Sequence, residues 1–279
     1  MTFRDLYDGF LFDLDGVVYA GQGAIPGAAE AISELKVSGF GIGFVTNNAS
    51  RSEAAVAEHL RELGVPADES CVFGSARTGV ELLGEEVERG ASVYVVGSDY
   101  LSGLVAEAGY EALSLEQMEH GARADAVIQG FDPGLGWRHL AAASYAIAGG
   151  AAWVATNKDA TIPRAEGIAP GNGALVGTVE TATGRMPAVG GKPQAPIFER
   201  AQRELGLERP LMCGDRLDTD IAGANAAGID SALVLTGIDG RQDAERAETG
   251  LRPTYVVDSL TALVSGDDPE RLRLGGGEQ

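Results

Sequence analysis

Three apolar runs in this chain each end abruptly in polar residues. The runs and the polar residues that follow them are Phe10–Phe12 before Asp13 and Asp15, Gly41–Val45 before Thr46–Asn48, and Pro210–Cys213 before Gly214–Asp220. Short apolar runs that alternate with helical stretches are typical of the strands of a parallel sheet. Ligands bind beyond the carboxyl ends of the strands in such a sheet. We therefore expect these polar residues to meet in one crevice.

The alternation of strand-like and helix-like stretches predicts an α/β fold with a doubly wound parallel sheet. About 140 residues separate Asn48 from Lys192, which is too long for an ordinary loop. This span contains strand-like runs at 93–96, 126–128 and 152–155. We therefore predict an inserted α/β domain at residues 88–187, with the core domain formed by residues 1–87 and 188–279.

The charge of the chain narrows the choice of partners. The 279 residues contain 21 Lys and Arg against 41 Asp and Glu, which gives a net charge of −20. A chain this acidic is a poor candidate for binding nucleic acid or an anionic membrane surface. The amino-terminal residues lack a basic start followed by an apolar core, and no apolar stretch reaches membrane-spanning length. We expect a cytoplasmic protein with neither kind of partner.

Four motifs occur in order along the chain: DLDGVVY at 13–19, TNNAS at 46–50, GKP at 191–193 and GDRLDTD at 214–220. This ordered set resembles the haloacid dehalogenase-like (HAD-like) hydrolase superfamily. It is most similar to the branch of p-nitrophenylphosphatases, which includes phosphatases of phosphoglycolate, glycerol phosphate and pyridoxal phosphate and the NagD-type enzymes. The resemblance extends from about Gly9 to Leu260 and implies a Rossmann-like core with a C2-type cap inserted into it.

The first motif carries the two residues that would perform the chemistry. A carboxylate can attack phosphorus and carry the phosphoryl group as an acyl phosphate, and Asp13 is the predicted nucleophile. Asp15 is the predicted general acid and base, which protonates the leaving alkoxide and later deprotonates water. Dehalogenases of the superfamily lack this second aspartate, so Asp15 argues against dehalogenation. An isolated D-x-D-G sequence would be no more than a solvated loop.

A dianionic phosphate needs a cation beside the nucleophile, and Mg²⁺ prefers oxygen ligands. The resemblance implies that the side chains of Asp13 and Asp215 and the backbone carbonyl of Asp15 bind Mg²⁺. Asp220 would lie behind them, orienting water on the metal or the Lys192 ammonium. We interpret Asp218 as the N-cap of a helix that begins at Thr219.

The second and third motifs supply groups for the phosphate itself. Thr46, Asn47 and Asn48 offer hydroxyl and amide groups at a turn between a strand and a helix, although an Asn pair also suits an ordinary turn. Lys192 would supply positive charge to both the phosphate and Asp13. A lysine is usually solvated, but Gly-Gly-Lys-Pro directly before a helix is an unusual setting for a surface residue.

Substrate selection would come from the inserted domain. The segment 156–164 resembles the cap loop of the family, in which Asn157 and Asp159 either brace the loop or form an ordinary turn. Pyridoxal-phosphate phosphatases have a histidine at the position that we align with Ile162. This difference favours a small leaving group such as glycolate or glycerol, whereas Arg164 could select an acidic one.

Together these features predict a Mg²⁺-dependent phosphatase of small phosphate monoesters, of the phosphoglycolate, glycerol phosphate or p-nitrophenyl phosphate type. The reaction would pass through an aspartyl-phosphate intermediate, with a small phosphorylated metabolite as substrate. A phosphomutase and a non-catalytic sensor of phosphate esters are the alternatives, and release of free phosphate separates them from a phosphatase. Cap helices in this branch often form dimer contacts, so a homodimer is an open alternative to a monomer.

Overall fold

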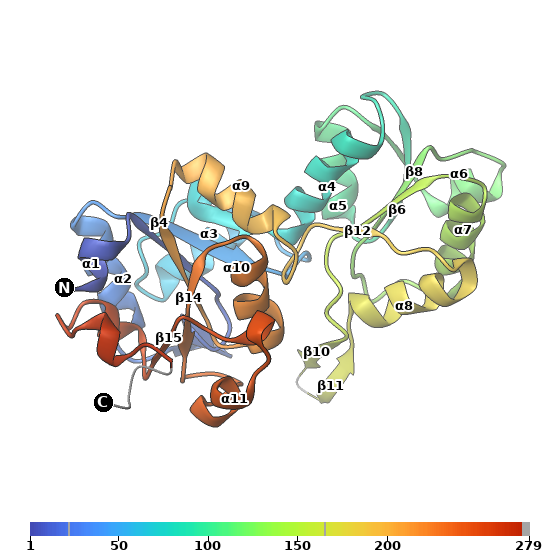
Figure 1. Ribbon diagram of the computed structural model, residues 1–279. Helices are drawn as coiled ribbons and strands as arrows, with labels where there is room; N and C mark the ends of the chain where they lie inside the picture. Colours follow the sequence, from blue (N-terminus) through green and yellow to red (C-terminus); the bar gives the residue numbers. More distant parts are fainter. Residues whose placement is uncertain (22, 165, 275–279) are drawn as a thin grey trace. The chain divides into compact units, whose positions relative to one another are not determined.

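The computed structural model describes residues 1–21, 23–164 and 166–274, and the chain forms two compact units (Figure 1). The core unit consists of Met1–Thr46, Glu53–Phe73 and Lys192–Gln279. The inserted unit consists of Asn47–Ser52 and Gly74–Gly191. The chain therefore passes between the units at four positions.

The core unit is built on a six-stranded sheet. Its strands, in spatial order, are β15 (Tyr255–Val257), β14 (Asp230–Val234), β13 (Pro210–Gly214), β1 (Gly9–Phe12), β4 (Gly41–Thr46) and β5 (Val72–Gly74). Strand β1 pairs in parallel with both β4 and β13, and β14 pairs in parallel with β13 and β15. The chain extends the sheet from β1 toward β5 and later from β13 toward β15. The strand order thus reverses between β1 and β13, which is the position where open α/β sheets bind ligands.

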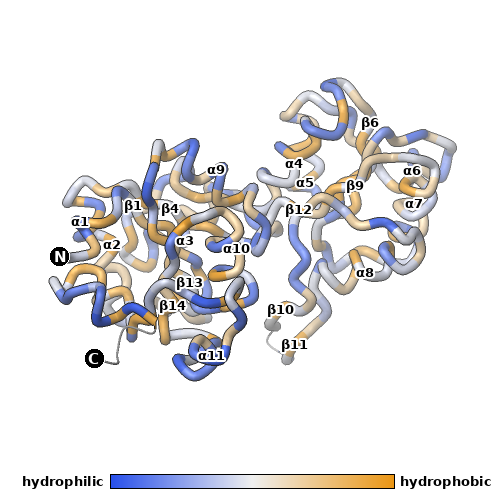
Figure 2. Tube along the Cα trace, in the orientation of Figure 1, coloured by the Kyte–Doolittle hydropathy of each residue, from blue (hydrophilic) through white to orange (hydrophobic). Residues whose placement is uncertain are grey.

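Helices cover both faces of this sheet because its strands are apolar on both sides. On one face, Phe10, Phe12 and Phe44 pack with residues of α2 (Ala28–Val37) and α3 (Glu53–Glu62). On the other face, Leu11 and Met212 pack with α9 (Pro196–Leu205) and α10 (Ala222–Ala226). Figure 2 shows hydrophobic segments along the strands, whereas the outer helix α11 (Arg241–Arg246) is mostly hydrophilic.

The inserted unit repeats this plan with a smaller sheet. Its five strands, in spatial order, are β12 (Ala188–Val189), β9 (Ala152–Ala155), β8 (Ala126–Gln129), β6 (Ser92–Val96) and β7 (Glu111–Leu113), all paired in parallel. Helices α4 (Ser75–Glu86) and α5 (Asp99–Glu107) cover one face. Helices α6 (Leu115–Glu119), α7 (Trp137–Ala148) and α8 (Asn172–Thr183) cover the other.

The contacts place the boundaries of the inserted unit outside the predicted range of 88–187. Helix α4, which the sequence assigned to the core, belongs to the inserted unit because Val80 and Leu83 pack with Leu101 and Leu104 of α5. The segment 47–52 also belongs to this unit, although it directly follows a core strand. The buried face of α4 carries Val80, Leu82 and Leu83, and the packing with α5 decides that this face belongs to the inserted unit.

Two hairpins and several short helical turns complete the structure. The hairpins are β2 (Tyr19–Ala20) with β3 (Gly23–Ala24), and β10 (Thr161–Arg164) with β11 (Gly167–Pro170). The remaining elements are α1 (Phe3–Leu6), η1 (Glu69–Cys71), η2 (Leu217–Ile221), η3 (Thr249–Leu251), η4 (Leu260–Leu263) and η5 (Pro269–Arg271). Across residues 1–21, 23–164 and 166–274, no helix is both long enough and apolar enough to cross a membrane.

Candidate active site

Three carboxylates gather at the carboxyl edge of the core sheet. Asp13 directly follows β1, Asp215 directly follows β13, and Asp220 lies in η2, a single π-helical turn. One oxygen from each lies within 4.8 Å of the other two. The parallel register of β1 and β13 causes this meeting, because it pairs Phe12 with Cys213 and ends both strands at the same edge.

Lys192 lies between two of these carboxylates. Its Nζ donates to Oδ1 of Asp13 at 2.5 Å and to Oδ1 of Asp220 at 2.6 Å. The lysine side chain is only 3% exposed, so this is a buried ion pair and not a surface contact. Lys192 is part of the short segment between β12 and α9, which carries it to the sheet edge.

Asp215 and Asp220 differ in how their oxygens are used. Oδ2 of Asp220 accepts hydrogen bonds from the backbone N–H groups of Asp215 and Arg216, while its Oδ1 accepts from Lys192. Oδ2 of Asp215 accepts from the backbone N–H of Ile238 at 2.8 Å. Its Oδ1 is buried and has no hydrogen-bond partner among the described residues. An orphaned carboxylate oxygen within a cluster of acids has the donor chemistry that a hard divalent cation requires, so these residues fit Mg²⁺.

Burial shifts the protonation equilibria of the site. It raises the pKa of the Asp13 carboxyl to about 8, although the neighbouring Lys192 ammonium acts in the opposite direction. Burial together with repulsion from Asp220 raises the pKa of Asp215 to about 6. Burial would lower the pKa of Lys192, but Asp13 and Asp220 overcome this effect and raise it, so the lysine stays protonated. The fixed ammonium of Lys192 balances part of the negative charge of the three carboxylates. A bound divalent cation would balance the remainder.

Asp15 is not one of the three clustered carboxylates. It is exposed, and the turn that carries it is closed by a hydrogen bond from the Gly16 N–H to the Tyr19 carbonyl at 2.8 Å. Gly16 has φ = 83°, a conformation that side chains with Cβ rarely adopt. A Cβ there would also lie 2.7 Å from Cγ of Asp215. The glycine therefore allows the first motif to turn while Asp215 approaches it closely.

The segment after β14 contributes contacts that the sequence analysis missed. The Thr236 hydroxyl donates to the Gly16 carbonyl at 2.6 Å, and Asp239 accepts from the Leu217 N–H at 2.7 Å. A Cβ on Gly237 would overlap the Asp215 side chain. These residues follow an apolar run, Ala232–Leu235, so the same strand-end signal that identified Asp13 could have identified them.

The interpretation of Asp218 as a helix N-cap is wrong. Asp218 lies inside η2, whose N-terminal flanking residue is Arg216. Both carboxylate oxygens of Asp218 accept from the Arg216 guanidinium, at 3.0 and 2.8 Å. This bond lowers the pKa of Asp218 below its usual value. The nearby guanidinium offered a stronger partner than the backbone N–H groups of a helix end.

The predicted phosphate-binding residues divide between the two units. Thr46 is buried at the end of β4 in the core unit, whereas Asn47 and the exposed Asn48 belong to the inserted unit. The Asn47 side chain donates through Nδ2 to Oδ1 of Asp159 at 2.8 Å. The Asn47 carbonyl accepts from Nδ2 of Asn157 at 2.8 Å. Two of the predicted cap residues therefore contact a predicted phosphate ligand directly.

The two other cap candidates lie in the hairpin that follows. Ile162 is half-buried in β10. The backbone of Arg164 ends the same strand, and its side chain lies outside the described part of the structure.

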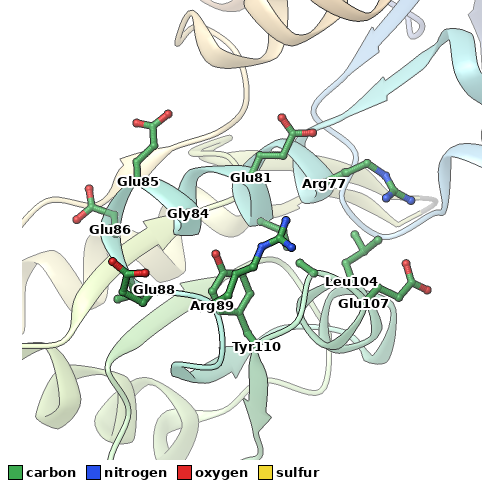
Figure 3. A pocket seen from close by; sticks show the side chains of 13 residues that line it. Arg77, Glu81, Gly84, Glu85, Glu86, Glu88, Arg89, Leu104, Glu107 and Tyr110 are labelled. Atoms are coloured by element: carbon green, nitrogen blue, oxygen red, sulfur yellow. The ribbon is translucent and has the colours of Figure 1, made fainter.

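The inserted unit also has an open groove of about 790 Å³ between α4 and α5 (Figure 3). Its charged lining residues are Arg77, Glu81, Glu85, Glu86, Glu88, Arg89 and Glu107. None of the predicted site residues lines this groove. We therefore take the carboxylate cluster with its buried lysine, and not this groove, as the candidate active site.

Comparison with known proteins identifies the family. A model of haloacid dehalogenase-like hydrolases matches residues 10–111, and a model of HAD-hydrolase-like proteins matches residues 189–263. D-glycerol 3-phosphate phosphatase from Mycobacterium tuberculosis is 43% identical over 257 residues, which cover 92% of this chain and 71% of the relative. The protein belongs to the haloacid dehalogenase-like hydrolase family. A 5′-nucleotidase from Bacillus subtilis is 36% identical over 92% of this chain and 98% of its own length.

Solved structures of this hydrolase family match nearly the whole chain. The M. tuberculosis glycerol phosphate phosphatase in complex with magnesium has a TM-score of 0.89 at 41% identity, covering 97% of this chain and 80% of that one. The p-nitrophenyl phosphatase from Archaeoglobus fulgidus has a TM-score of 0.83 at 31% identity, covering 92% and 98%. These matches confirm the predicted HAD branch, the α/β fold class and the prediction of a phosphoric monoester hydrolase.

Proposed function

We propose that this hydrolase is a Mg²⁺-dependent phosphatase of small phosphate monoesters, with glycerol phosphate as the first substrate to test. The observation that carries the proposal is the buried cluster in which Lys192 bonds Asp13 while Oδ1 of Asp215 remains unpartnered among the described residues. The candidate nucleophile Asp13, the Lys192 ammonium and an Asp215 oxygen suited to binding a metal ion thus lie at one sheet edge. The glycerol phosphatase relative supports this choice of substrate.

Asp13 would attack the phosphorus atom and form an aspartyl-phosphate intermediate, and water would then release the phosphate. Asp15 would give a proton to the leaving alkoxide and later take one from the attacking water. The exposure of Asp15 suits this role, because a proton donor must meet the leaving group and exchange its proton with solvent.

Asp13, Asp215 and the backbone carbonyl of Asp15 would hold Mg²⁺. When bound, the ion supplies positive charge that lowers the pKa of its carboxylate ligands and offsets the repulsion between Asp13 and a phosphate dianion. Asp220 would keep Lys192 and the backbone N–H groups of Asp215 and Arg216 in place.

Lys192 would serve both the resting enzyme and the reacting one. In the absence of substrate, its ammonium balances Asp13 and Asp220. As the phosphoryl group is transferred, the same ammonium would neutralise charge on the phosphoryl oxygens. Because the group is already buried and held by two bonds, little reorganisation is needed when the charge moves.

Thr46, Asn47 and Asn48 would bind the phosphoryl oxygens, and the inserted unit would act as the cap that selects the leaving group. Asn157, Asp159, Ile162 and Arg164 are the residues through which it would do so. The remaining predictions, of a cytoplasmic location, of a homodimer and of neither nucleic-acid nor membrane partners, stay predictions.

The test is release of inorganic phosphate from glycerol phosphate, phosphoglycolate, p-nitrophenyl phosphate, a sugar phosphate and a 5′-nucleotide, with Mg²⁺ and with EDTA. We expect release that depends on Mg²⁺ and is fastest with a small leaving group. Phosphate transfer to an added acceptor without net release would indicate a mutase. Binding of the esters without turnover would indicate a sensor.

A further inference from the structure

The segment 47–52 is attached to the inserted unit by hydrogen bonds that converge on its first residue. The carbonyl of Asn47 accepts from Nδ2 of Asn157 and from the hydroxyl of Ser75, both at 2.8 Å. Nδ2 of Asn47 donates to Oδ1 of Asp159, also at 2.8 Å. Ser75 is fully buried and Asn157 is 5% exposed, so solvent competes little for these bonds.

The turn that presents Asp159 is itself rigidly held. The Asp159 N–H donates to Oδ1 of Asn157 at 3.2 Å, and the Asp159 carbonyl accepts from the Gly173 N–H at 2.8 Å. The Asn157 carbonyl accepts from Nδ2 of Asn172, at the start of α8, at 2.8 Å. A Cβ on Gly173 would overlap the Lys158 carbonyl, so the turn packs closely against the helix. Asp159 therefore has a fixed position relative to α8.

We propose that Asp159 is a positioning residue, which orients the side-chain amide of Asn47 for the phosphoryl group and so makes phosphate binding depend on the inserted unit. This inference rests on the proposed function, because it requires Asn47 to contact the phosphoryl oxygens. The carboxylate holds one N–H of the Asn47 amide and so fixes the rotation of the whole group. Asn157 and Ser75 hold the backbone of the same residue. The cap thereby acts on the phosphate as well as on the leaving group.

A direct contact between Asp159 and the leaving group is the competing explanation, and the two explanations differ in how mutations combine. If Asp159 acts through Asn47, its loss has no further effect once the Asn47 amide is gone. If Asp159 contacts the substrate, the two losses multiply. A double-mutant cycle on kcat/KM therefore separates them.

The experiment measures kcat and KM for glycerol phosphate and p-nitrophenyl phosphate with Asn47→Ala, Asp159→Ala and the double variant. We expect kcat/KM to fall about 10-fold for Asp159→Ala and about 100-fold for Asn47→Ala. The double variant should equal Asn47→Ala within about threefold. A double variant about 1000-fold below wild type, the product of the single effects, would overturn the proposal.

Two further variants guard against a general structural defect. Lys158 lies in the same turn as Asp159 and forms an ion pair with Glu180 of α8, and Lys158→Ala, which removes this pair, should leave kcat/KM unchanged. Asp159→Asn has nearly the same shape and keeps an oxygen that accepts from Asn47, so it should retain activity within about threefold of wild type. If Asp159→Asn is as impaired as Asp159→Ala, the charge of Asp159 matters and not its bond to Asn47, and the proposal is wrong. Absence of Mg²⁺-dependent phosphate release by the wild-type protein would instead overturn the proposed function, and this inference with it.

Discussion

The two parallel sheets of this protein follow the same plan but carry different chemistry at their carboxyl edges. The edge of the core sheet gathers Asp13, Asp215 and Asp220 around the Lys192 ammonium. The corresponding edge of the inserted sheet gathers buried neutral side chains, namely those of Gln129, Thr156, Asn157 and Asn172. The shared architecture supplies a place where side chains meet, and the residues at the strand ends decide what that place can do.

The two edges also differ in energetic terms. Carboxylates are buried at the core edge, where burial and repulsion between neighbouring acids raise the pKa values of Asp13 and Asp215. At the inserted edge the cost is of another kind, because polar atoms of Gln129, Thr156 and Asn172 lack hydrogen-bond partners within the described ranges. Charge at one edge and neutrality at the other lead to four predictions.

The largest expected effect comes from neutralising the nucleophile. Asp13→Asn should lower kcat more than about 10³-fold, because an amide cannot form the phosphoenzyme. The matched control is Asp125→Asn, whose carboxylate accepts a backbone N–H beside the inserted sheet. The control should keep wild-type activity. The activity of both variants is measured as release of inorganic phosphate from p-nitrophenyl phosphate. Appreciable turnover by Asp13→Asn would show that Asp13 is not the nucleophile and that the core edge does not differ from the inserted edge in this way.

Loss of the fixed cation should come next. Lys192→Met leaves Asp13 and Asp220 buried without their counter-charge, so we expect the free energy of unfolding in EDTA to fall by about 3 kcal/mol. Lys158→Met removes an ion pair in the inserted unit whose side chains are 31% and 24% exposed, and it should cost less than about 1 kcal/mol. Urea denaturation compares the two, and equal losses would contradict the distinction between a buried charged edge and a solvated one.

The third prediction concerns pH. The raised pKa of Asp215, about 6 against a usual value of 3.8, means that the folded protein holds this proton more tightly than the unfolded chain does. In the metal-free protein, stability is therefore lost as the pH rises from about 4 to about 6, as Asp215 ionises. Asp215→Asn removes the free-energy cost of ionising this buried carboxyl and should raise the free energy of unfolding in EDTA by about 3 kcal/mol above pH 6.

This gain should vanish below about pH 4, where the wild-type carboxyl is protonated in both the folded and the unfolded state. Saturating Mg²⁺ should reverse the order of the two proteins, because only the wild type keeps the full ligand set. Thermal unfolding across this pH range, with EDTA and with Mg²⁺, tests both statements. If Asp215→Asn is less stable than wild type in EDTA at pH 8, ionisation of the buried Asp215 carboxyl does not destabilise the folded protein, and the prediction is wrong.

The smallest effect lies at the neutral edge. Gln129 is fully buried at the end of β8, and neither of its amide atoms has a partner within the described structure. Gln129→Leu should raise the free energy of unfolding by about 1 kcal/mol, because it removes unpaired polar atoms, and should leave kcat and KM unchanged. A loss of activity in this variant would show that the inserted edge also carries function.

Particular elements show how far the sequence predicted the structure. The predicted run at 152–155 is strand β9 (Ala152–Ala155), and the run Gly41–Val45 forms all but the last residue of β4 (Gly41–Thr46), because each is a sharply limited apolar pattern. Strand ends also located Asp13 and Asp215, since parallel strands bring their carboxyl ends to one edge. The prediction failed where a side chain had two possible partners. Asp218 was expected to cap a helix, but it bonds the Arg216 guanidinium instead.

The sequence by itself determined the family, the α/β fold class and the reaction type, because these depend on local patterns and on the order of motifs along the chain. Only the tertiary structure decided that α4 and the segment 47–52 belong to the inserted unit. It alone brought Asn157 to the carbonyl of Asn47 across 110 residues of sequence. The physical reason is that the sequence shows which faces must be buried and which amide groups must be hydrogen-bonded, but it does not show which residues will be their partners. That choice is made when distant segments pack together.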